Sequence, residues 1–126
     1  GVMADDVMIE NTVPILSVRD MAASLEYYEK VLGFTRAPWG DTFTSVGRDG
    51  WGIYLAEGAQ GGPGTWVWIG VHDVTRLHAE FVESGANIIL PPTNYPHALE
   101  MRVKDMDEHI LRFGSGPLED QPYADY

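Results

Sequence analysis

Large and β-branched residues alternate along residues 65–71, and this period of two predicts a β-strand. The alternation places Val67, Ile69 and Val71 on one face, which a helix can cover. It places Trp66, Trp68 and Gly70 on the opposite face. Two indoles on one face can fill a core, and they can equally line a pocket. The pattern of this strand leaves both interpretations open.

The segment before this strand predicts a strand, a helix and three more strands. The first strand is expected over Thr12–Val18, and Asp20 is a suitable N-cap for a helix that reaches about Leu32 and stops at Gly33. Apolar stretches then predict three short strands, at residues 34–38, 42–46 and 51–57. Arg48–Gly50 is the expected turn between the last two.

The same succession begins again at the tryptophan strand. Asp73 caps a second helix that reaches about Ser84 and stops at Gly85, and three strands follow, at residues 87–90, 99–104 and 109–113. This internal repeat has a period of about 53 residues and predicts two tandem βαβββ modules with curved mixed sheets in one α+β domain. The modules span about residues 11–57 and 65–114, joined by a Gly-rich linker at 58–64 and followed by an acidic tail at 115–126.

Composition narrows the possible partners of the chain. The 126 residues include no cysteine, which excludes disulfides and thiolate metal sites, and the formal net charge is −11. Nucleic acid is not expected as a partner because no basic cluster is present. The negative net charge would attract a cationic small molecule. A simpler interpretation is that the negative charge only keeps the protein soluble.

No stretch approaches the length and apolar character of a membrane span, and residues 1–9 lack the pattern of a signal peptide. We therefore expect no membrane association and a cytoplasmic location.

Several motifs resemble the opening of the vicinal-oxygen-chelate superfamily, which includes glyoxalase I, extradiol dioxygenases and bleomycin-resistance proteins. They are the run Val13–Asp20, the pair Tyr27 and Tyr28, and the run Val31–Phe34. The resemblance extends over about residues 11–114 and implies paired βαβββ modules and, for a small member, a homodimer.

Metalloenzymes that this chain resembles carry His, Gln or Glu at four positions on the sheet faces turned away from the helices. The resemblance places those positions here at Val13, Tyr54, Trp66 and Arg112. Valine, indole and guanidinium offer no lone pair to a cation, and tyrosine alone would ligate poorly. The four histidines show no HExxH or facial-triad spacing: His72, His78, His97 and His109. We therefore expect no metal and no other cofactor.

The chain is more similar to the bleomycin-resistance branch, whose members are acidic dimers that bind a cationic glycopeptide between subunits with aromatic side chains. Val13–Pro14 resembles the hinge of a swapped N-terminal strand in that branch. Two further places resemble its sheets. Phe34–Arg36, followed by Phe43 and Arg48–Asp49, resembles the first half of the sheet, and Thr65–Trp68, followed by a helix that contains Ala79–Glu80, resembles a Trp-Val-Trp strand. Where that branch has a stacking tryptophan before a late strand, this chain has His97, so we expect a planar or cationic ligand other than bleomycin.

Nine residues are candidates for ligand binding. The period of two places six of them on the faces turned away from the helices: Tyr54, Trp66, Trp68, Glu100, Arg102 and Arg112. Trp39 and Phe43 belong to segments that could form the rim, and the resemblance adds His97 at the place of the stacking tryptophan. Two sheets set side by side would bring them into one trough. Trp51 has the opposite parity to Tyr54 and is left out of the site. Glu100 would either hold a ligand amine or pair with an arginine, and unpaired arginines would favour an anionic or carbonyl-bearing ligand.

Three functional hypotheses follow. The first is a metal-free homodimer that sequesters an antibiotic-like compound without breaking a bond. The second is a glyoxalase-like lyase or isomerase, or a dioxygenase-type enzyme, working through Tyr54, Glu100 and Arg112. The third is a small module that senses a metabolite for a partner protein.

Overall fold

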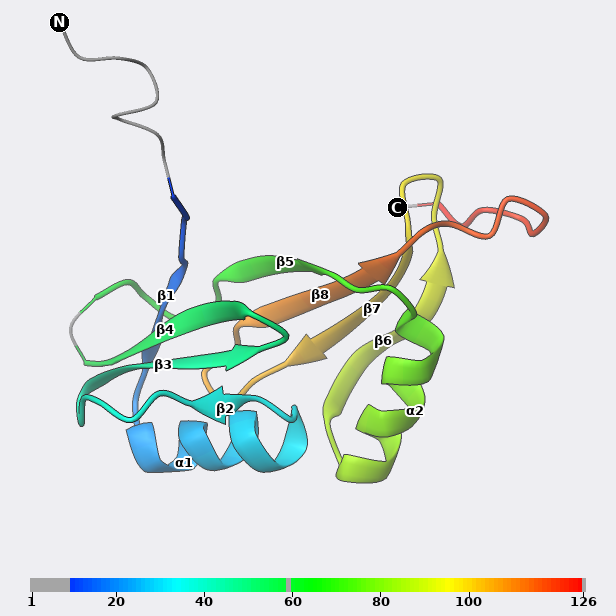
Figure 1. Ribbon diagram of the computed structural model, residues 1–126. Coiled ribbons are helices and arrows are strands. Elements are labelled where there is room, and N and C mark those ends of the chain that lie inside the picture. Colours follow the sequence, from blue (N-terminus) through cyan, green and yellow to red (C-terminus); the bar gives the residue numbers. More distant parts are fainter. Residues whose placement is uncertain (1–9, 59, 126) are drawn as a thin grey trace, which may run out of the picture.

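The computed structural model describes residues 10–58 and 60–125, which form two four-stranded sheets with helices packed on one face of each (Figure 1). The first module consists of β1 (Ile15–Val18), α1 (Met21–Glu26), the π-helical continuation η2 (Tyr27–Val31), β2 (Thr35–Arg36), β3 (Phe43–Arg48) and β4 (Trp51–Glu57). The second consists of β5 (Trp66–Gly70), α2 (Val74–Ser84), β6 (Asn87–Asn94), β7 (Leu99–Lys104) and β8 (Ile110–Ser115).

The two sheets have the same topology. Their strand orders are β1-β4-β3-β2 and β5-β8-β7-β6, and the first strand of each module lies parallel to the last. The remaining pairs are antiparallel. The predicted α+β fold of two βαβββ modules is therefore confirmed.

Local capping explains where the helices begin and end. The carboxylates of Asp20 and Asp73 each accept a hydrogen bond from a backbone N–H three residues on, at 3.1 Å in both cases. Gly33 and Gly85 follow the helices with φ of 74° and 86°, as expected for helix C-termini.

Six of the eight strands differ in their bounds from those the sequence predicted, and the two strand ends that differ most both involve proline. β1 starts at Ile15 rather than Thr12, because Pro14 has no N–H to donate; its carbonyl still accepts from Tyr54 N at 3.0 Å. β6 continues to Asn94 through Pro91 and Pro92 instead of ending at residue 90. It is an edge strand whose register shifts twice against β7, which accommodates both prolines.

β1 pairs with β4 of its own chain, with Ile15 opposite Tyr54. The exchange of an N-terminal strand between protomers, and the homodimer itself, stay predictions. The segment 1–9 that would precede such a strand lies outside the described residues.

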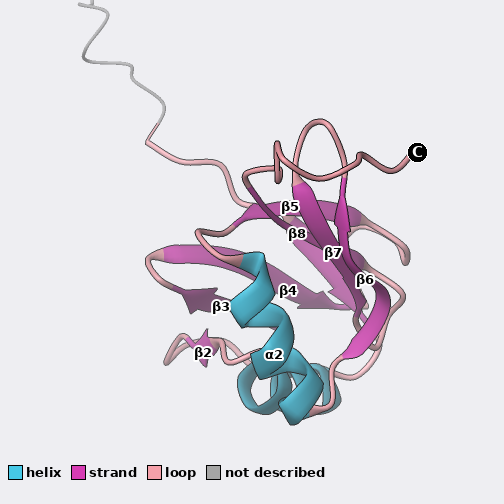
Figure 2. Ribbon diagram, turned by 90° about the vertical axis from the view of Figure 1, so that its right-hand side faces the viewer, coloured by secondary structure: helices cyan, strands magenta, loops and turns pink. Residues whose placement is uncertain are grey.

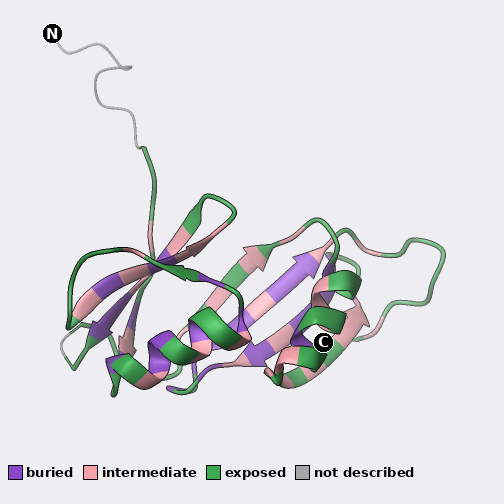
Figure 3. Ribbon diagram, turned by 60° about the horizontal axis from the view of Figure 1, so that its bottom comes forward, coloured by how far each residue is buried: buried purple, intermediate pink, exposed green. Residues whose placement is uncertain are grey.

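Both sheets turn their helix-side faces toward one shared core. Leu16, Val46 and Leu55 from the first sheet belong to the same buried cluster as residues of the second sheet and of both helices: Met101, Val103, Leu111, Phe113, Tyr28 and Phe81. These positions form the buried stripes of the strands and helices (Figure 3). The opposite faces, which carry most of the candidate site residues, consequently turn outward.

Polar contacts to two buried carboxylates join the first module to the turn between β7 and β8. Tyr28 Oη donates to Asp105 Oδ2 at 2.7 Å, and Arg19 Nε donates to Asp107 Oδ1 at 2.9 Å. Burial raises the pKa of the Tyr28 hydroxyl, and the neighbouring Asp105 raises it further, so Tyr28 remains a donor. These contacts fix the orientation of α1 against the second sheet. In the view of Figure 2, α2 lies between β2 and β3 of the first sheet and β6 and β7 of the second.

Candidate functional site

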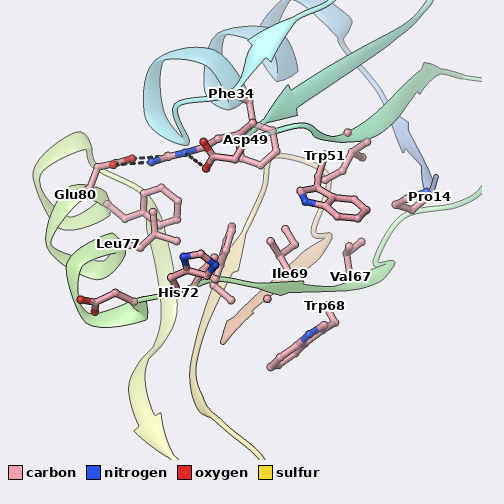
Figure 4. A pocket seen from close by; sticks show the side chains of 18 of the residues that line it. Pro14, Phe34, Asp49, Trp51, Val67, Trp68, Ile69, His72, Leu77 and Glu80 are labelled. Atoms are coloured by element: carbon pink, nitrogen blue, oxygen red, sulfur yellow. Dashed lines mark hydrogen bonds and ion pairs between the residues drawn. The ribbon is translucent and has the colours of Figure 1, made fainter. Parts of the chain in front are cut away.

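The outer face of the second sheet carries two indoles that no part of the described chain covers. Trp66 is 57% exposed and Trp68 is 49% exposed, whereas Val67 and Ile69 pack against the core. Figure 4 shows the Trp68 side chain on the opposite side of β5 from Val67 and Ile69. The alternation predicted for this strand is therefore correct, and its indoles do not fill the protein's own interior.

A buried carboxylate lies beneath the indoles. Glu100 on β7 has no exposed side-chain surface. Arg112 donates to it through Nε and Nη2, both at 2.8 Å, Arg102 Nε donates at 2.7 Å, and His97 Nε2 lies 2.9 Å from Oε1. Burial raises the pKa of Glu100, but the hydrogen bonds from Arg112, Arg102 and His97 outweigh burial and lower the pKa to about 2. Of the two roles predicted for Glu100, the structure shows the pairing with arginine.

The two arginines in turn support the indoles. The guanidinium carbon of Arg102 lies 5.5 Å from the centre of the Trp66 ring, and that of Arg112 lies 5.4 Å from the Trp68 ring. Both distances are within the range of cation–π attraction. The buried Glu100 thus holds two guanidiniums, and each guanidinium holds an indole at the surface.

A glycine lets the second indole approach the sheet. Gly114 lies on β8, and a Cβ atom at this position would overlap the six-membered ring of Trp68. His97 completes this part of the surface, with its ring centre 6.1 Å from that of Trp68 and 5.6 Å from that of Tyr95. Tyr95 was not among the predicted site residues, because it is buried in the turn before β7, where no strand alternation assigns a face.

The remaining aromatic candidates form a separate cluster on the first sheet. Phe43 on β3 and Tyr54 on β4 have ring centres 5.2 Å apart, and Trp39 in the preceding loop lies 6.3 Å from Phe43 and 6.1 Å from Tyr54. Phe43 and Tyr54 are half-buried, and Trp39 is exposed. This face offers a second aromatic surface.

The structure does not bring the nine candidate residues into one trough. Among the described residues, no ring contact joins the cluster of Trp39, Phe43 and Tyr54 to the indoles of β5. The expectation that the two sheets of one chain enclose a trough on their outer faces is wrong, because both helix-side faces meet in the shared core. One chain presents two open aromatic half-sites.

A cleft of about 870 Å³ lies between the modules on the helix side of β5 (Figure 4). Its walls include Ile53 of the first module and Val67, Ile69 and Phe113 of the second. Of the nine candidates only Trp68 borders it, whereas Trp51, which the period of two excluded from the site, lies at its edge and is 81% exposed. The cleft forms where the two modules pack together, and the residue pattern along the strands does not predict that packing.

The positions at which related metalloenzymes carry their ligands hold residues that do not fit a metal in this chain. Trp66 and Arg112 lie on the outer face of the second sheet, and the guanidinium of Arg112 is bound to Glu100, whereas Tyr54 belongs to the first sheet. In residues 10–58 and 60–125, no group of three or more His, Asp and Glu side chains is placed to hold a metal ion. At these positions the guanidinium repels a cation and the indole N–H cannot ligate one, while valine has no ligand atom, so the Tyr54 hydroxyl alone would have to hold the ion.

The fold and these faces can now be compared with known proteins. A model of the glyoxalase/bleomycin resistance protein/dioxygenase superfamily matches residues 9–113. The chain belongs to this superfamily. No curated protein matches it closely.

Several solved structures share the fold of this chain at low sequence identity. A bleomycin-binding protein from bleomycin-producing Streptomyces verticillus, complexed with copper(II)-bleomycin, is 24% identical with a TM-score of 0.74, covering 87% of this chain and 98% of that one. TnmS3, an antibiotic-binding protein from Streptomyces sp. CB03234, is 20% identical with a TM-score of 0.71, covering 89% and 100%. A virulence protein from Salmonella typhimurium is 17% identical with a TM-score of 0.71, covering 86% and 99%.

None of the helices in residues 10–58 and 60–125 is long and apolar enough to span a bilayer.

Proposed function

We propose that this superfamily member binds a planar, antibiotic-like aromatic compound without a metal and sequesters it without breaking a bond. The observation that carries the proposal is the pair of half-exposed indoles, Trp66 and Trp68, each held on a guanidinium that a buried carboxylate anchors. Aromatic rings fixed in place before a guest arrives lose little entropy on binding, which favours affinity. Two of the structural neighbours are named for binding bleomycin or another antibiotic, which supports the same ligand class here.

The functional unit that we propose is a homodimer. Each chain has one aromatic group on each outer face, and either group alone covers only one side of a planar guest. A site would be complete where the Trp66 and Trp68 face of one protomer meets the Trp39, Phe43 and Tyr54 face of a second copy, as the resemblance to bleomycin-resistance proteins implies. Each stacked aromatic pair would add about 0.5–1.5 kcal/mol beyond the burial of area.

Tryptophan quenching tests this proposal. The protein is titrated with bleomycin and with a panel of planar antibiotics, and the same titration is repeated with Trp68→Ala and with the matched control Trp51→Phe. We expect at least one planar compound to quench saturably, with an affinity that falls at least tenfold in Trp68→Ala, a loss of about 1.4 kcal/mol, and stays unchanged in Trp51→Phe. Equal affinity for all three proteins, or no quenching across the panel, would contradict the proposal.

The enzyme hypothesis is less well supported. Glu100 is buried and fully engaged with Arg102, Arg112 and His97, and Tyr54 lies on the other sheet, so one chain does not assemble the expected catalytic group. Elemental analysis of the purified protein, together with chemical analysis of the bound compound after incubation, distinguishes an enzyme from a binding protein.

A further inference from the structure

The outer face of the second sheet is a basic surface on an acidic protein. The alternation of β7 places Glu100, Arg102 and Lys104 on this face, and β8 adds Arg112. Three of the eight basic residues of the chain therefore share a sheet face with the indoles, and β7 supplies one carboxylate there, although the formal net charge of the whole chain is −11.

The carboxylate neutralises only one of these cations. Glu100 forms ion pairs with both Arg102 at 2.7 Å and Arg112 at 2.8 Å, so a positive charge remains on the pair of arginines before Lys104 is counted. Arg112 uses two of its nitrogens for Glu100, whereas Arg102 uses only Nε. Within the described part of the chain, the two Nη atoms of Arg102 make no hydrogen bond, and its side chain is partly exposed beside Trp66.

The opposing aromatic face would not compensate this charge. The outward positions on the strands of the first sheet are uncharged: Ile15, Ser17, Phe43, Ser45, Gly52 and Tyr54. The acid of the adjoining loop, Asp41, is exposed to solvent near Trp39. Charges elsewhere on the molecule act weakly at this face, because the screening length at physiological ionic strength is about 8 Å.

We infer that the preferred guest of this face is a planar aromatic compound carrying an anionic group, such as a carboxylate, sulfonate or ionised phenol, which the Nη atoms of Arg102 bind while the ring stacks on Trp66 or Trp68. This inference rests on the proposed binding function and specifies the chemistry of its ligand. A guanidinium and an anion form a strong, charge-assisted pair of hydrogen bonds, whereas an ammonium group at the same place meets uncompensated positive charge. The net acidity of the chain predicted a cationic guest, and the local charge of this face favours the opposite.

Three probes with one aromatic core test the inference by tryptophan quenching of the full-length protein. They are an anthracene carboxylate, its aminomethyl analogue and its hydroxymethyl analogue, all substituted at the central ring, so that stacking is held constant and only the charge varies. We expect the carboxylate to bind at least tenfold more tightly than the aminomethyl analogue, with the neutral compound between them. Added salt should narrow this difference.

Arg102→Gln removes the proposed anion-binding group, and Lys30→Gln removes one positive charge from an exposed site on η2, which is part of neither aromatic face. The ratio of carboxylate affinity to neutral-probe affinity should fall at least tenfold in Arg102→Gln and stay unchanged in Lys30→Gln. Taking this ratio cancels the loss of stacking that both probes share when the support of Trp66 is removed. If Arg102→Gln does not fold, as judged by circular dichroism, the preference of the wild-type protein and its salt dependence decide the question.

The outcomes separate this inference from the proposed function. Equal binding of the three probes, or tighter binding of the aminomethyl analogue, overturns the anionic ligand and leaves planar-ligand binding in place. A carboxylate preference that persists in a folded Arg102→Gln protein overturns the assignment to Arg102. No quenching by any of the three probes would overturn both.

Discussion

At the scale of single residues, the position of Trp68 depends on the absence of a side chain at Gly114. A Cβ at this position would overlap the indole ring. Because the ring is half-exposed and can move outward, we expect Gly114→Ala to displace the indole with a cost in folding stability below about 1 kcal/mol. Affinity for the planar ligand should fall at least tenfold, and the indole N–H resonance of Trp68 should shift in the NMR spectrum.

Gly116→Ala is the matched control, since a Cβ there meets no atom within 4 Å. It should leave both the resonance and the affinity unchanged. An unaltered Trp68 resonance in Gly114→Ala would show that the glycine does not position the ring.

Glu100 should make folding stability depend on pH in a defined range. Its folded-state pKa of about 2 lies below the ordinary value of 4.5, so its ionisation stabilises the folded state fully above pH 4.5. This contribution is lost as the pH falls from 4.5 toward 2. Glu100→Gln lacks the ionisation and leaves two guanidiniums without their carboxylate, so we expect it to lower the free energy of unfolding at neutral pH by about 3–5 kcal/mol.

Urea unfolding at a series of pH values measures both effects. The difference in unfolding free energy between wild type and Glu100→Gln should be largest at neutral pH and should shrink below pH 4.5. Glu29→Gln, at an exposed position of η2, serves as the control and should stay close to wild type. A difference that is constant from neutral pH to pH 2 would contradict the assigned ion pairs.

The sequence predicted the orientation of the indoles but not their support. Alternation along β5 was sufficient to place Trp66 and Trp68 opposite Val67, because a strand has only two faces. Arg102 lies on β7 and Trp66 on β5, and these strands are separated by β8 in the sheet. The contact between the two side chains therefore depends on the order of the strands, which the residue pattern of a single strand does not predict.

At the scale of secondary-structure elements, the packing of the first helix against the turn between β7 and β8 depends on Tyr28. Its hydroxyl donates to Asp105, and both side chains are buried. Tyr28→Phe removes the donor and leaves Asp105 Oδ2 unsatisfied, which we expect to cost about 1–3 kcal/mol of unfolding free energy. Chemical denaturation measures this loss, and Tyr123→Phe, in the exposed C-terminal segment, should be neutral.

Helix capping and strand alternation involve only residues close in sequence, and they predicted the elements that depend on them. β4 and β7 have the predicted bounds, and both helices begin after the predicted aspartates, because capping and alternation are local. The extension of β6 could not be predicted. Pro91 and Pro92 ordinarily end a strand, and only its place at the edge of the sheet tolerates them.

At the scale of the whole molecule, two aromatic faces that point away from each other predict a symmetric dimer. Sedimentation equilibrium at micromolar concentration should give twice the chain mass of 14.0 kDa. A single-chain mass over the full concentration range would contradict the composite site, although a site on the Trp66 and Trp68 face alone would still be possible.

The repeat in the sequence predicted two modules of one topology but not their arrangement. Helix-side residues such as Leu55 and Met101 share one core, which turns the outer faces apart and opens the cleft beside Trp51. This arrangement is set by contacts between distant segments, including those of Tyr28 and Arg19 with the turn after β7.

The central claim is that the protein holds a planar guest on its indoles without a metal and without chemistry. Equilibrium dialysis of chelator-treated protein against the anthracene carboxylate, followed by mass spectrometry of the recovered compound, tests this most directly. We predict saturable binding that Trp68→Ala weakens at least tenfold, with the compound recovered unchanged. Binding that requires restored metal, or recovery of a chemically altered compound, would contradict the account.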